Sequence, residues 1–77
     1  MYKPSTWRTI PLPVLLVELI RLRSGTIRDR ELYEMVKQIQ DISYHEFLKA
    51  LLVLEVRGII SVSLQRENVR IITLLRK

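Results

Sequence analysis

The chain has 77 residues, no cysteine, and thirteen Lys and Arg against eight Asp and Glu, for a net charge of +5. A chain of this length forms one domain, near the lower size limit for a hydrophobic core that is stable by itself. Because there is no cysteine, neither disulfides nor thiolate metal sites can stabilise that core. A moderate positive charge favours polyanionic partners without specifying one. The composition suits a reducing, cytoplasmic compartment, and its many charged residues and isoleucines fit a thermophilic source.

Residues 1–12, MYKPSTWRTIPL, contain two prolines and show no regular period. They predict an extended N-terminal arm in which Trp7 anchors either to its own domain or to a partner. The apolar run that follows, to residue 22, is too short and too often interrupted by charge to span a membrane. It predicts a buried helix over 13–23, with Pro13 in the first turn and Gly25 as a left-handed cap. The apolar face of this helix comprises Leu15, Leu16, Leu19, Ile20 and Leu22.

Thr26 and Ile27 form a short extended link that can supply one rung of a sheet. Asp29 is the expected N-cap of a second helix over 30–40, because its side chain can accept a bond from the first turn. The apolar stripe of that helix comprises Leu32, Met35, Val36 and Ile39.

The third helix has the strongest start signal, because Ser43-x-x-Glu46 matches a capping box. It is expected to run to about Arg57 and to stop at Gly58. Helical spacing places Phe47, Ala50, Leu51 and Leu54 toward the core, with Tyr44 at its edge. The outer side carries His45, Lys49, Leu52, Val53 and Val56. Tyr33 and Tyr44 have rings that can stack on bases, although tyrosines at helical spacing more often line the core edge.

Two strands are expected at 59–64 and 69–75, joined by QREN, so the fold class is α+β. The chain has a single histidine, so a zinc site or a catalytic triad would lack a second histidine, and two glycines leave little room for a phosphate-binding loop. The sequence therefore predicts a protein that is not an enzyme, with no cofactor and no small-molecule substrate.

The stretch LKALLVLEVRGII resembles the third-helix and wing signature of winged helix-turn-helix domains, in the version found in MarR-like and ArsR-like regulators. RELYEMVKQIQDIS is similar to the second helix and turn of that family. The resemblance implies three helices followed by a two-stranded β-hairpin wing over residues 13–77.

The same resemblance implies DNA binding through the major groove. His45, Glu46 and Lys49 would face base edges, and Arg66 and Arg70 would serve the wing. Arg28 and Arg30 would contact backbone phosphate at the start of the second helix.

One departure from the family pattern leaves two interpretations open. Leu52 and Val53 stand where typical members carry polar or basic residues, and Val56 extends the apolar stripe. Exposed apolar side chains favour a contact with the arm, a second copy or another protein. The chain is therefore expected to be a DNA-binding module, as a small regulator or within a nucleic-acid complex. The alternative is a protein-interaction module, an accessory subunit of an archaeal replication, transcription or membrane-remodelling complex. A homodimer or a larger protein partner is expected in either case.

Overall fold

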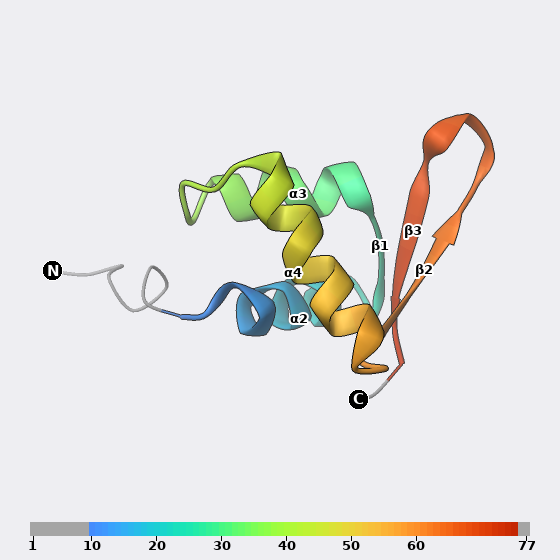
Figure 1. The fold of residues 1–77 in the computed structure, drawn as a ribbon, viewed down its shortest axis with the longest axis horizontal. Coiled ribbons are helices and arrows are strands. Elements are labelled where there is room, and N and C mark those ends of the chain that lie inside the picture. The colour runs from blue at the N-terminus through green and yellow to red at the C-terminus, as the bar shows by residue number, and fades with distance from the viewer. Residues whose placement is uncertain (1–9, 76–77) are drawn as a thin grey trace, which may run out of the picture.

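A computed structural model describes residues 10–75 of the chain, and these residues form an α+β domain (Figure 1). Helices and strands alternate at first, and a hairpin closes the order. The elements are α2 (Leu12–Leu22), β1 (Thr26–Arg28), α3 (Asp29–Lys37), α4 (Tyr44–Val56), β2 (Ile60–Leu64), a 3₁₀ turn (Arg66–Asn68) and β3 (Arg70–Leu74).

The three strands form one antiparallel sheet in the order β1-β3-β2, so the last strand in the chain lies in the middle. Ile72 of β3 is paired with Ile27 on one side and Val62 on the other. The predicted hairpin of β2 and β3 is confirmed, although both strands are slightly shorter than predicted. The predicted rung at residues 26 and 27 is also confirmed, and it makes the sheet three-stranded rather than two-stranded.

The helices pack together on one side of the sheet, and the core lies between the two layers (Figure 1). Each fully buried Leu, Ile, Val or Phe contributes roughly 1.5–3 kcal/mol by leaving water. All four residues predicted to form the core side of α4 are buried. The whole buried apolar set is Leu15, Leu16, Leu19, Ile20, Ile27, Leu32, Val36, Phe47, Ala50, Leu51, Leu54, Ile60 and Ile72.

The start and end of α4 follow local sequence signals. Ser43 Oγ accepts the Glu46 N–H at 3.1 Å, and Glu46 Oε1 accepts the Ser43 N–H at 3.0 Å, so the capping box is formed. At the other end Gly58 has φ +75°, which a side-chain-bearing residue adopts only with strain. The Ile59 N–H then reaches back to the Leu54 carbonyl at 3.0 Å, which completes a Schellman motif.

Replacing Ser43 with alanine should lower the free energy of unfolding by about 1 kcal/mol, because the Glu46 N–H loses its acceptor. Urea denaturation followed by circular dichroism measures this change. Ser63→Ala, at an exposed position in β2, is the matched control and should change stability by less than about 0.5 kcal/mol. An equal loss of unfolding free energy in Ser43→Ala and Ser63→Ala would show that the capping hydrogen bond does not stabilise the domain.

The prediction that Asp29 is the N-cap of α3 is wrong. Arg28 occupies that position without a side-chain cap bond, and Asp29 is the first helical residue. Arg28 pairs with Ile71 in the sheet, so its extended backbone fixes where the helix can begin. Asp29 is 3% exposed and accepts the Arg30 N–H at 2.8 Å. The helix also ends at Lys37, short of the predicted residue 40.

The limits of α2 differ from prediction in three ways. The helix begins at Leu12, inside the predicted arm of residues 1–12. Its left-handed cap starts at Ser24, with φ +65°, and continues through the expected Gly25, with φ +90°. Leu22, predicted on the apolar face, is instead 72% exposed, whereas Leu19 and Ile20 in the same turn are buried. Trp7 and the rest of residues 1–9, with residues 76–77, lie outside the described part of the chain.

Candidate functional site

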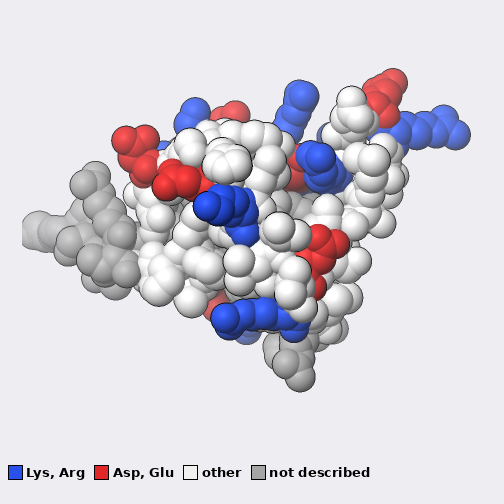
Figure 2. Space-filling view, viewed as in Figure 1, with Lys and Arg blue, Asp and Glu red and all other residues white. Residues whose placement is uncertain are grey.

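The outer face of α4 changes character along the helix. Its first half carries the exposed polar residues His45, Glu46 and Lys49. Its second half carries Leu52, Val53 and Val56, whose exposed fractions are 58%, 43% and 78%. Figure 2 views the molecule from the side on which α4 lies in front, where large uncharged areas separate the charged groups. The apolar outer stripe predicted from the sequence is therefore exposed within residues 10–75.

The polar half of α4 is held in place by aromatic packing against α3. The ring of Tyr33 lies 5.1 Å from those of Tyr44 and Phe47, measured between centroids. Tyr33 also donates its hydroxyl to the Ile42 carbonyl at 3.4 Å. Both tyrosines thus line the core edge as expected, with Tyr44 remaining 40% exposed. This cluster fixes the direction in which the first turn of α4 presents its side chains.

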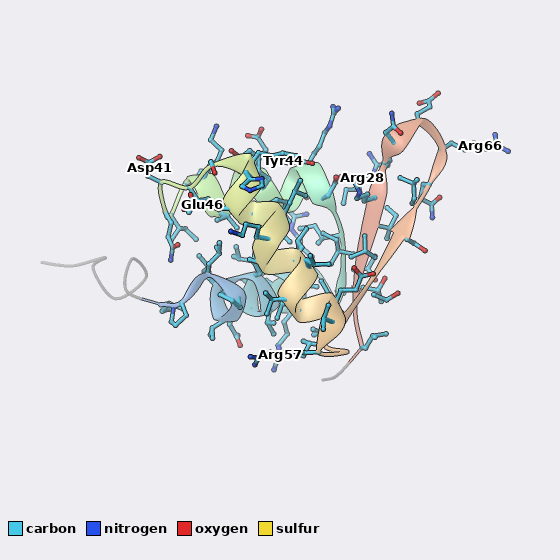
Figure 3. The ribbon with its side chains drawn as sticks, in the orientation of Figure 1. Arg28, Asp41, Tyr44, Glu46, Arg57 and Arg66 are labelled. Carbon is cyan, nitrogen blue, oxygen red and sulfur yellow. The ribbon has the colours of Figure 1, made fainter. Side chains whose placement is uncertain are left out.

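Of the three residues predicted to face base edges, Glu46 is already engaged. Its carboxylate accepts the Ser43 N–H in the capping box, and Figure 3 shows it at the start of α4 beside Tyr44. His45 and Lys49 are exposed on the same helix. The residues available on this surface for a polyanion are therefore a histidine and a lysine.

The hairpin and the start of α3 bring further arginines to the surface. Arg66 lies at the tip of the hairpin and Arg28 at the junction of β1 and α3 (Figure 3). A hollow of about 500 Å³ separates the start of α3 from the hairpin turn. Its lining mixes signs, since Arg28, Arg30 and three glutamates share it. The lining residues are Arg28, Asp29, Arg30, Glu31, Glu34, Glu67, Asn68 and Val69.

The second predicted wing residue, Arg70, contacts a carboxylate of the domain itself. Its Nη1 lies 3.6 Å from Asp29 Oδ2, and the two side chains are 42% and 5% exposed. This ion pair ties the central strand to the first turn of α3. Arg66 is thus the exposed member of the predicted pair, and Arg70 has a structural contact.

A groove between α2 and α4 was missed by the sequence analysis. It has a volume of about 310 Å³ and adjoins the apolar half of α4 through Val53. Val14 and Glu18, one helical turn apart on α2, were the available signal, because they lie outside the stripe that packs into the core. The groove is lined by Pro13, Val14, Val17, Glu18, Val53, Leu54, Arg57 and Ile59.

The positive charge is concentrated outside the described residues. Residues 10–75 contain nine Lys and Arg against eight Asp and Glu, which leaves a single net positive charge. The other four, Lys3, Arg8, Arg76 and Lys77, belong to residues 1–9 and 76–77. Attraction of the described body for a polyanion therefore depends on where its arginines lie more than on its total charge.

Comparison with known proteins finds no matching family model, no matching curated protein and no matching solved structure. Within residues 10–75, no helix has the length and apolarity needed to cross a bilayer. The same residues hold no group of three or more His, Asp or Glu side chains placed to bind a metal ion.

Proposed function

We propose that this chain is a non-enzymatic winged-helix module that contacts duplex DNA in a cytoplasmic setting. The observation that carries the proposal is an exposed helix with a polar first half, α4, followed by a hairpin whose tip bears Arg66. In a winged helix these two elements are the ones that reach the groove and the backbone. The order of helices and strands, including β1 beside the hairpin, supports the same assignment.

The dimensions of α4 suit a major groove. Thirteen residues at a rise of 1.5 Å each give a helix of about 20 Å, and the B-DNA major groove is about 12 Å wide. Lys49 and His45 would meet base edges or phosphates from the first half. Arg28, Arg30 and Arg66 would position the domain by phosphate contacts, which supply affinity without sequence preference.

Replacing Arg66 with glutamine should flatten the dependence of DNA affinity on salt. The slope of log K against log salt is negative, and removing one phosphate contact reduces its magnitude by about 0.9. Fluorescence anisotropy with a labelled duplex, titrated at several salt concentrations, measures that slope. A triple variant, Arg28→Gln with Lys49→Gln and Arg66→Gln, should lower it by about 2.7.

Arg21→Gln is the matched control, because it removes the same charge from the outer side of α2. The slope should be unchanged in this variant. Equal reductions from Arg21→Gln and Arg66→Gln would mean that only total charge matters. A wild-type chain without salt-dependent binding to duplex DNA would remove the proposal.

The second candidate function is protein interaction, as an accessory subunit docked through α4. Exposure of Leu52, Val53 and Val56 on one helical face favours it, since that half of the helix offers nothing to a polyanion. Complete burial of such a side chain is worth roughly 1.5–3 kcal/mol, so covering the exposed part of each of the three would recover a share of that free energy. The two functions use different halves of α4.

A further inference from the structure

The apolar half of α4 and the groove beside it form one face, because Val53 belongs to both. We define the α2–α4 face by Val14 and Val17 on α2 and by Leu52, Val53 and Val56 on α4. Val14 is 50% exposed, between the values for Val53 and Leu52. The face is therefore a two-helix surface rather than a single stripe.

Two opposite charges border this face, one on each wall of the groove. Glu18 projects from α2, and Arg57 lies at the end of α4, at the lower edge of the view in Figure 3. The ion pairs formed among residues 10–75 are Arg23–Glu31 and Arg70–Asp29, so Glu18 and Arg57 remain outside them. Both are exposed.

We propose that the α2–α4 face is the interface of a twofold symmetric homodimer, in which Glu18 pairs with the partner's Arg57 and Arg57 pairs with Glu18 of the partner subunit. In such an interface every contact occurs twice, so a surface must be complementary to its own rotated copy. An apolar centre bordered by one acid and one base meets that condition.

The border also disfavours other occupants. An acidic partner would repel Glu18, and a basic partner would repel Arg57, whereas a rotated copy matches both. This inference rests on the proposed docking use of α4 and does not depend on DNA contact.

Sedimentation equilibrium of the full chain, without DNA and at concentrations up to about 1 mM, tests the dimer. Wild type should show a monomer–dimer equilibrium. Val53→Glu should raise the dissociation constant by about 100-fold or more, because it buries two unpaired carboxylates per dimer. Leu64→Glu is the matched control, since Leu64 is 68% exposed on the hairpin, away from the face, and its variant should dimerise normally.

A charge exchange tests the pairing itself. Glu18→Arg should raise the dissociation constant roughly tenfold, because two attractive contacts become repulsive. Adding Arg57→Glu to the same chain should restore the wild-type value, since both pairs are re-formed with exchanged signs. The exchange acts at exposed positions, and circular dichroism verifies that each variant is folded.

Three results would overturn the inference: a wild-type chain that stays monomeric, a dimer that survives Val53→Glu, or a double exchange that fails to restore association. The first includes the case in which a different protein occupies the face. The DNA proposal fails or holds independently of the dimer, because it is tested by DNA affinity and Arg66→Gln should leave the monomer–dimer equilibrium unchanged. A dimer without DNA affinity would retain the interface and remove only the nucleic-acid role.

Discussion

Replacing Phe47 with alanine should lower the free energy of unfolding by about 3–5 kcal/mol. Phe47 is completely buried in the described domain and lies within ring contact of Tyr33 and Tyr44. The substitution removes the largest fully buried side chain and the aromatic contacts that join α3 to the start of α4. A domain of this length has a total stability of roughly 4–12 kcal/mol, so the variant should be largely destabilised.

Urea denaturation followed by far-ultraviolet circular dichroism measures the loss. Glu55→Ala is the control on the same helix, because Glu55 is exposed and lies outside the α2–α4 face, so this variant should cost less than about 0.5 kcal/mol. Phe47→Leu should fall between the two, since it keeps most of the apolar volume but loses the ring contacts. A loss below about 1 kcal/mol for Phe47→Ala would contradict the placement of this side chain in the core.

Replacing Arg70 with methionine should destabilise the domain by about 2 kcal/mol, more than Asp29→Asn does. The two partners differ in exposure: the Asp29 carboxylate is 5% exposed, and the Arg70 guanidinium is 42% exposed. Without Arg70 a nearly buried charge keeps the Arg30 N–H and the helix N-terminus as favourable neighbours but loses its cation. In Asp29→Asn the half-exposed Arg70 guanidinium can be solvated by water instead, so the expected loss of unfolding free energy is about 1 kcal/mol.

Thermal or urea unfolding of the two single variants and of the double variant checks this asymmetry. The double variant should lose less than the two single losses combined, because both act on one contact. Strictly additive losses would show that the ion pair contributes nothing. A larger loss for Asp29→Asn would instead assign the contribution to its bond with the Arg30 N–H.

Signals confined to one turn of chain predicted the structure well. Ser43 and Glu46 are three positions apart and hydrogen-bond to each other, so the capping box that they predict does not depend on contacts with distant residues. Gly58 ends α4 for a similarly local reason, since its left-handed backbone needs only the preceding turn. The core face of α4 followed from spacing because the helix is bounded at both ends by such signals.

Predictions that depended on distant residues were less accurate. Asp29 follows a residue whose backbone is fixed by a strand more than forty positions later, and its carboxylate is engaged by that same strand. No local rule can assign Arg28 to the cap and Asp29 to the interior. The contact between Arg70 and Asp29 could not be predicted for the same reason, because its two residues are remote in sequence.

The candidate surfaces show the same division. Exposure of Leu52, Val53 and Val56 was predictable from helical angle alone. The groove was not, because Val14 and Glu18 become part of a surface only when α2 lies against α4. Net charge gave no guide to location, since four of the thirteen basic residues lie outside residues 10–75.

The central position of β3 has a consequence for the order in which the domain is completed during synthesis. A ribosome releases β1 and β2 before the strand that pairs with both, and Thr26 finds its partner only when Thr73 has emerged. The helices can collapse earlier, but the sheet closes in a single late step. Until then the nascent chain exposes two unpaired strands, which is when mispairing with a neighbouring chain is most favourable.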